Sequence, residues 1–244
     1  MNRSGLWALL MIPACALAAN PVQHSGLAPV IDGVGEDPAW QQADWRPLSH
    51  LITGSMPAQE DFSGRFKLLW DEDHLYLQAE ITDDVLFDHH PDPLIQYWND
   101  DALEIFIDSD ASGGEHQYNH SAFAYHIALD NQAVDLAEDG RPALYNDHLR
   151  SRWQRSADAP HVMVWEVAIR LFDDAYKDGR ANPPLALQAG RKIGFMLAYC
   201  DNDGSPEREH FVGSADILPV EGDRNRGWLD AGVFESFVLA GSSD

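Results

Sequence analysis

Apolar and polar residues alternate with a period of two along much of the chain. In residues 75–82, apolar side chains occupy the odd positions and mostly polar ones the even positions. Such a pattern is typical of a half-buried antiparallel β-strand. It predicts strands at residues 65–70, 75–82, 102–108, 123–129 and 163–170, and two further apolar runs predict strands at 193–199 and 232–239.

The segments between these strands are rich in turn-forming residues. Clusters of Asp, Asn, Gly and Pro occupy residues 71–73, 108–114, 130–132 and 201–206. These residue types favour turns because they tolerate left-handed backbone or bond their own main chain. We expect short helical turns at 37–43 and 170–176, and long connections over the edges of the fold at 141–159 and 178–190. The predicted fold class is all-β, an antiparallel β-sandwich of the jelly-roll or immunoglobulin-like kind.

The first 19 residues have the pattern of an export signal. Arg3 gives a positive start, residues 6–12 are apolar, and Ala16-Leu17-Ala18 matches a signal-peptidase site. The apolar run is too short for a transmembrane helix, which needs about 20 residues. We therefore predict a signal peptide at 1–19 and a single domain at 20–244.

A second processing route stays open at the same end. The string Ile12-Pro13-Ala14-Cys15 is similar to a bacterial lipobox, and cleavage there leaves a lipidated Cys15 as the new N-terminus. Both routes predict an exported protein, periplasmic or extracellular, and the second one anchors it to lipid through Cys15.

Charge and cysteine content narrow the classes of partner and of fold. The chain has 16 Lys and Arg against 40 Asp and Glu, a formal charge of −24, which argues against nucleic acid as a partner. Hydrophobic residues make up 45%, too many for a disordered chain. Cys200 is the one cysteine beyond the signal, so no internal disulfide can form and the apolar core must hold the fold.

Several strings, in order along the chain, resemble the signature motifs of family 9 carbohydrate-binding modules. The entry motif is matched by Ile31-Asp32-Gly33 and Asp37-Pro38-Ala39-Trp40. Later motifs are matched by residues 68–84, by WNDDALEIFID at 98–108, by WEVAIR at 165–170, and by residues 193–203 and 228–239. The resemblance implies an antiparallel β-sandwich that holds the end of a glucose or xylose oligomer between two tryptophans.

Matching the motifs residue by residue implies a set of ligand-binding side chains. The tryptophans are Trp98 and Trp228, the carboxylate is Glu104, and the cation is Arg208. The chain has His126 where sugar-binding members have an arginine, and Ala198 where they have a glutamine, so the resemblance leaves the sugar and its linkage open.

The residue types also suit a sugar on physical grounds. Indole faces cover the C–H face of a pyranose, and a carboxylate accepts charge-assisted hydrogen bonds from its hydroxyls. Strand parity places Glu104 and His126 on the side of their strands that faces away from the core. The alternative for Trp98 and Trp228 is packing at the rim of the sandwich. We predict a non-catalytic carbohydrate-binding protein for carbohydrate catabolism, with a mono- or oligosaccharide bound at Trp98, Trp228, Glu104, His126 and Arg208.

Clustered aspartates indicate a calcium site. Calcium prefers several carboxylate oxygens as ligands. Family 9 modules bind structural calcium, so the resemblance implies a calcium ion in this protein as well. We take Asp83, Asp84 and Asp101 as candidate ligands of a structural calcium ion, with solvated acidic turns as the alternative.

Two other functions remain as alternatives. The first is an exported haem- or metal-binding sandwich of related fold that uses its histidines and Met196. The second is a glycoside hydrolase with Glu104 and Glu166 as its carboxyl pair. Both glutamates are predicted on open sheet faces, where little would raise the pKa of an acid, and motifs such as GxSxG and GxGxxG are absent. We therefore predict no catalytic residues and no enzyme.

Overall fold

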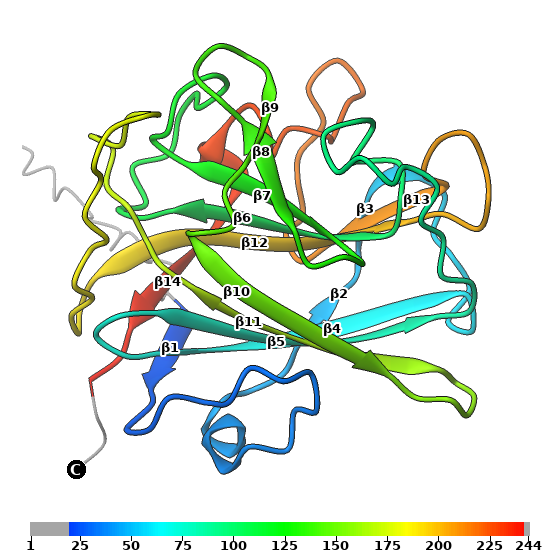
Figure 1. The fold of residues 1–244 in the computed structure, drawn as a ribbon, viewed down its shortest axis with the longest axis horizontal. Helices are drawn as coiled ribbons and strands as arrows, with labels where there is room; N and C mark the ends of the chain where they lie inside the picture. The colour runs from blue at the N-terminus through cyan, green and yellow to red at the C-terminus, as the bar shows by residue number, and fades with distance from the viewer. Residues whose placement is uncertain (1–19, 242–244) are drawn as a thin grey trace, which may run out of the picture.

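The computed structural model describes residues 20–241, so the predicted export signal and Cys15 lie outside the described residues. Two layers of β-strands face each other, with the β6–β7–β12 layer above the β4–β5–β11–β10 layer in Figure 1. The strands are β1 (Asn20–His24), β2 (Arg46–Leu48), β3 (His50–Gly54), β4 (Phe62–Trp70), β5 (Leu75–Asp83), β6 (Ala102–Asp108), β7 (Phe123–Ala128), β8 (Ala133–Leu136), β9 (Pro142–Leu144), β10 (Leu149–Arg155), β11 (Val162–Ile169), β12 (Lys192–Asp201), β13 (His210–Gly213) and β14 (Glu235–Leu239). Short 3₁₀ helices lie at Pro38–Gln42 (η1) and Ala231–Val233 (η2).

The first strand joins the two layers. Residues 20–22 of β1 pair with β14 in one sheet, and residues 23–24 pair with β4 in the other. Both pairings are parallel, whereas the other pairs of named strands are antiparallel. The predicted β-sandwich is therefore confirmed as the fold class.

The core lies between the layers and is built from the inward rows of the predicted strands. On β6 and β12, Ile105 stands opposite Leu197, and both are fully buried. The facing layer contributes the row Leu75, Leu77, Ala79 and Ile81, together with Trp165 on β11. The alternation read from the sequence therefore records which side of each strand faces this core.

Several local predictions were wrong. Residues 170–176 form a turn, closed by the Tyr176 N–H donating to the Asp173 carbonyl, and not a helix. The predicted connection 141–159 contains β9 and β10, and the run 232–239 begins with η2 before β14. In β10 the side chains Arg150 and Arg152 point outward, so the strand looks polar in sequence although it pairs with β11 along its whole length.

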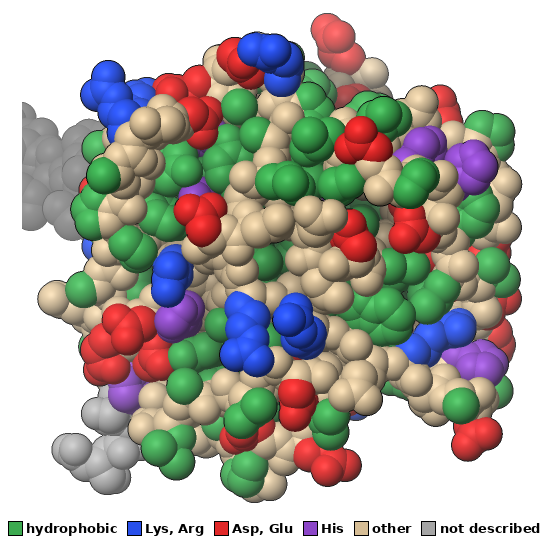
Figure 2. Space-filling view, in the orientation of Figure 1, with side chains coloured by type: hydrophobic (Ala, Val, Ile, Leu, Met, Phe, Trp, Pro, Cys, Tyr) green, Lys and Arg blue, Asp and Glu red, His purple; other side chains and the backbone are tan. Residues whose placement is uncertain are grey.

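The surface carries the acidic excess of the sequence. Figure 2 shows Asp and Glu side chains spread over the visible face, with Lys and Arg in a few small groups. No helix among the described residues is long and apolar enough to cross a bilayer.

Candidate functional site

A pocket of about 370 Å³ lies on the outer face of the β6–β7–β12 sheet. It is lined by Tyr97, Trp98, Glu104, His116, Gln117, Tyr118, Asn119, Ala122, His126, Asp135, Leu136, Gly140, Arg208, Asn225 and Trp228. All five residues that the sequence proposed for ligand binding are in this set. They come from positions 98–228, so only folding brings them to one place.

The floor of the pocket is a row of side chains across three strands. Glu104 on β6 is paired with His126 on β7 and with Ala198 on β12. Glu104 and His126 face away from the core, as strand parity predicts, because Leu103 and Ile127 beside them pack inward. The predicted open face is wrong, however: surrounding loops leave only 2% of Glu104 and 7% of His126 exposed.

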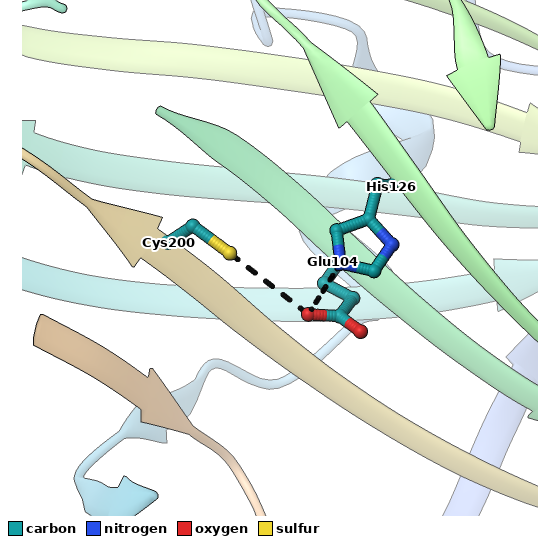
Figure 3. Close-up of side chains that lie close together, drawn as sticks. All are labelled: Glu104, His126 and Cys200. Carbon is teal, nitrogen blue, oxygen red and sulfur yellow. Dashed lines mark hydrogen bonds and ion pairs between the residues drawn. The ribbon is translucent and has the colours of Figure 1, made fainter. Parts of the chain in front are cut away.

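Glu104 is the centre of the polar contacts in this row. Its Oε2 lies 3.0 Å from His126 Nε2, 3.8 Å from Arg208 Nη1 and 3.9 Å from Cys200 Sγ. Figure 3 shows His126 and Cys200 reaching Glu104 from the two flanking strands. Arg208 also donates to Cys200 Sγ at 3.1 Å and lies 3.9 Å over the Phe211 ring. Glu104 is thus a buried carboxylate held between two potential cations.

The same three side chains have the spacing of a metal centre. Donor atoms of Glu104, His126 and Cys200 lie within 4.8 Å of one another, as transition-metal ligands do. Three observations argue against a metal there. The Arg208 guanidinium already contacts the thiol, and His126 Nδ1 has no hydrogen-bond partner among the described residues, whereas a metal-bound imidazole usually donates from its other nitrogen. Burial also raises the pKa of the Cys200 thiol to about 12, which disfavours the thiolate.

Three further side chains of the haem- or metal-binding alternative, His116, His120 and Met196, have other partners. His116 Nε2 lies 2.6 Å from the Gly227 carbonyl, and His120 Nε2 lies 3.1 Å from Asp178. Met196 is buried in an apolar cluster with Phe106 and Phe211. These three side chains therefore serve packing and hydrogen bonding, whereas His210 groups with Asp61 and Asp201 at a spacing that could hold a metal ion.

Aromatic side chains form the rim of the pocket. Trp98, in the loop before β6, is 41% exposed, and Trp228, in the loop before η2, is half-buried with its Nε1 donating to the Asn225 carbonyl at 3.1 Å. Tyr97 supports one side: its ring meets the rings of Trp98 and His126 edge-on, with centroids 5.0 and 4.7 Å apart. The structure therefore brings the two predicted tryptophans to one pocket.

Several pocket residues were not predicted from the sequence. Tyr97, Tyr118 and Asn119 lie in loops without any periodic pattern, and Asp135 belongs to the short strand β8. Asp135 accepts the Ala124 N–H at 2.8 Å, and burial raises the pKa of its carboxyl. The motif at 98–108 pointed to the loop of Trp98, but no pattern in the sequence singled out Tyr97, Tyr118 or Asp135.

The predicted calcium ligands separate into two groups. Asp83 and Asp101 join Asp201, which the sequence did not single out, and carboxylate oxygens of the three lie within 4.8 Å of one another. Asp84 instead groups with Asp61 and Asp203 near the surface. The structure therefore does not bring all three predicted ligands together.

The Asp83–Asp101–Asp201 group is buried, with no residue more than 2% exposed. Burial, together with the charge of neighbouring carboxylates, raises the pKa of each of the three. One oxygen each of Asp83 and Asp201 is buried without a hydrogen-bond partner among the described residues. Uncompensated buried carboxylate oxygens at this spacing fit a hard cation such as calcium.

The hydrolase alternative fails on the placement of Glu166. This residue is on β11, in the sheet opposite to that of Glu104, and is fully buried. Its carboxylate accepts the N–H groups of Asp32 and Gly33 at 3.1 and 2.8 Å and the indole N–H of Trp40 at 2.7 Å. These hydrogen bonds join the entry motif (residues 31–40) to the WEVAIR strand (residues 165–170). Because Glu104 and Glu166 lie in opposite sheets, they do not form a catalytic pair.

A family model, "Carbohydrate family 9 binding domain-like", matches residues 31–242. The chain belongs to this family. Family 9 domains are non-catalytic modules, which confirms that the matched residues are not an enzyme domain. This agrees with the site, where the candidate catalytic pair is not assembled.

Solved structures similar to this family 9 domain show the same fold. A family 9 carbohydrate-binding module from Caldicellulosiruptor kristjanssonii in complex with cellotriose has a TM-score of 0.66 at 22% identity, covering 92% of this chain and 95% of that one. A family 9 module from the same organism in complex with glucose has a TM-score of 0.66 at 21% identity, covering 92% of this chain and 98% of that one.

Curated relatives of the family 9 domain are much longer enzymes. Exoglucanase XynX of Acetivibrio thermocellus is 24% identical over 215 residues, which is 87% of this chain and 16% of the relative. Endo-1,4-beta-xylanase A of Thermotoga neapolitana is 34% identical over 80 residues, 33% of this chain and 7% of the relative. The chain thus spans less than a fifth of either relative.

Proposed function

We propose that this family 9 domain is an exported protein that binds a sugar in the pocket on the β6–β7–β12 sheet. Trp98 and Trp228 cover the faces of a pyranose ring, while Glu104, His126 and Arg208 bond its hydroxyls. The observation that carries the proposal is that five residues chosen from the sequence for this chemistry line a single pocket.

The contacts within the pocket suit a neutral, hydroxylated ligand. Glu104 offers acceptor oxygens, and the Arg208 guanidinium offers donors beyond the one that it directs at Cys200. A hydroxyl can both donate and accept, so it can bridge these two side chains. Ligands without hydroxyls would leave the remaining hydrogen-bonding groups of Glu104 and Arg208 without partners and should be rejected.

Cello-oligosaccharides are the first sugars to test, because similar family 9 structures hold cellotriose and glucose. The similarity to an exoglucanase and to xylanases supports a setting in the breakdown of plant polysaccharides. Xylo-oligosaccharides are therefore the second series.

Calorimetric titration with cellotriose tests the proposal. Trp98→Ala and Trp228→Ala should each weaken binding at least tenfold, because each removes one face of the clamp. Trp98→Ala should unfold near the temperature of the wild type, whereas Trp228→Ala also loses packing on the cluster of Phe106 and Met196 and should unfold at a lower temperature. Trp45→Ala is the matched control, since Trp45 is half-buried and lies outside this pocket, over Arg65. Equal, unweakened binding in both pocket variants would refute the clamp.

Export is the second part of the proposal. It rests on the pattern of residues 1–19, and the two processing routes predict different products. Expression of the full chain in a bacterium, followed by N-terminal sequencing and mass spectrometry, should yield a product beginning at Asn20 or one lipidated at Cys15. A protein that keeps Met1 and stays in the cytoplasm would contradict export.

We further propose a structural calcium ion held by Asp83, Asp101 and Asp201. Binding to the folded state alone would stabilise the domain by about 2.7 kcal/mol at a calcium concentration 100 times the Kd. The melting temperature should therefore rise with calcium and fall with a chelator. Asp201→Asn should abolish that difference, whereas Asp84→Asn, at the neighbouring surface group, should keep it. A melting temperature that calcium leaves unchanged would refute the proposal.

A further inference from the structure

A third aromatic side chain reaches the pocket. Among the Phe, Tyr and Trp side chains of residues 20–241, Trp98 and Tyr118 are the two that are exposed, at 41% and 49%, and both line this pocket. Single exposed apolar residues are common on proteins, but the confinement of exposed aromatic rings to one concave site indicates contact with a ligand.

The backbone holds Tyr118 in a conformation that this residue type rarely adopts. Its φ is +60°, in the left-handed region, within the loop between β6 and β7. Asn119 N–H donates to the His116 carbonyl at 3.1 Å and closes the turn around it. Left-handed conformations of non-glycine residues are uncommon and cluster at binding sites, where the surrounding structure keeps them in place.

The ring of Tyr118 rests against the turn of the β8–β9 hairpin. A Cβ atom at Gly140 would lie 3.2 Å from the Tyr118 ring, closer than ordinary contact, and Gly140 itself has a φ of +76°. Glycine is therefore required there twice, for the backbone angle and for the approach of the ring. The contact fixes the ring in place while half of its surface stays open to solvent.

Tyr118 comes from the loop between β6 and β7, a different loop from those that carry Trp98 and Trp228. Its neighbour Gln117 also lines the pocket and brings an amide group that both donates and accepts hydrogen bonds, whereas the Asn119 amide bonds Glu115 and Ser121 within the loop. An aromatic face beside an amide is suited to a pyranose, in the same way as an indole beside Glu104.

We propose that Tyr118 forms a second sugar subsite, which binds the unit next to the one held between Trp98 and Trp228. The domain then prefers a disaccharide or longer oligosaccharide over a monosaccharide, and Tyr118, seated on Gly140, sets that preference. This inference rests on the proposed sugar binding in the main pocket.

Titrations of the full mature chain with glucose, cellobiose and cellotriose test the subsite. Wild type should bind cellobiose and cellotriose at least tenfold more tightly than glucose. Tyr118→Ala should weaken cellotriose about five- to tenfold and leave glucose within twofold, because only the longer ligand reaches the ring. Tyr118→Phe, which keeps the aromatic face, should retain most of the preference.

Two further variants separate ring stacking from a general loss of apolar surface. Tyr118→Leu keeps an apolar contact with Gly140 but has no flat ring, so it should lose the preference while its melting temperature stays near that of the wild type. Leu144→Ala, on the neighbouring strand β9, removes an exposed apolar side chain outside the pocket and should change nothing.

The outcomes distinguish the subsite from sugar binding itself. A wild-type protein that binds all three sugars with equal affinity would overturn the subsite, as would an equal loss of glucose and cellotriose in Tyr118→Ala. Absence of binding to any member of the cello- and xylo-oligosaccharide series by wild type would instead refute the proposed function.

Discussion

The imidazole of His148 is wedged between two tyrosine hydroxyls, and we expect it to make the fold sensitive to acid. Tyr125 Oη lies 2.8 Å from Nδ1 and Tyr176 Oη lies 2.9 Å from Nε2. The ring packs on Phe172, with centroids 4.2 Å apart, and is 1% exposed. Burial lowers the pKa of His148 from 6.5 to about 4, although the charge of Asp147 acts in the opposite direction.

The lowered pKa of His148 determines the direction and the size of the change in folding stability with pH. Between pH 6.5 and 4 the unfolded chain takes up a proton at His148 that the folded chain does not, so stability is full above pH 6.5 and falls as the pH falls. At pH 5 the loss is about 2 kcal/mol, and well below pH 4 it reaches about 3 kcal/mol, at roughly 1.36 kcal/mol per pKa unit.

Urea unfolding at pH 7.5, 6 and 5, with calcium held constant, measures this loss. His148→Gln removes the titrating ring, so the wild type should lose about 2 kcal/mol more than the variant between pH 7.5 and 5. Taking the difference between the two proteins cancels the titration of the many carboxyl groups. His89→Gln, on an exposed loop, leaves the burial of His148 untouched and should follow the wild type. Equal losses in wild type and His148→Gln would show that the burial of this ring does not control the acid response.

Three further predictions concern the scaffold. Glu166→Ala leaves buried N–H groups without their acceptor and should cost about 3 kcal/mol of unfolding free energy in urea, with cellotriose affinity unchanged; a loss below 1 kcal/mol would contradict the role of its hydrogen bonds. Cys200 is fully buried and its thiol has a pKa of about 12, so a maleimide should label it only in urea, and rapid labelling of the native protein would show otherwise. Gly33→Ala should lower the melting temperature of the domain more than Gly179→Ala. Both glycines have a positive φ, but a Cβ at Gly33 would lie 2.6 Å from the Trp153 carbonyl carbon, whereas Gly179 faces open space. Thermal melts of the two variants check this, and equal shifts would contradict it.

The parts of the fold that could be predicted from the sequence are those whose two sides differ in environment. Strands β5 and β11 face the core on one side, so their apolar residues fall on alternate positions. Strand β10 was missed because its outward arginines mask the inward Leu149 and Trp153, and β13 was missed because it is only four residues long. Short strands carry too few positions for a period to be seen.

The residues of the candidate site also fall into those that could be predicted from the sequence and those that could not. Glu104 and His126 could be placed because strand parity fixes the direction of a side chain. Tyr118 and Asp135 reach the pocket through loops and a short hairpin, whose paths depend on contacts such as the Tyr118 ring on Gly140. Asp201 was assigned to a turn, because a carboxylate at the end of a strand gives no sign in sequence of the neighbours it will meet.

The row Ala198–Glu104–His126 lies on the outer side of strands whose inner side forms the core. Substitutions in this row change the side chains on the outer face of the sheet. They leave unchanged the core residues on the inner face, which stabilise the fold. Domains that descend from one ancestor can therefore diverge in specificity by replacing a few side chains on a conserved scaffold.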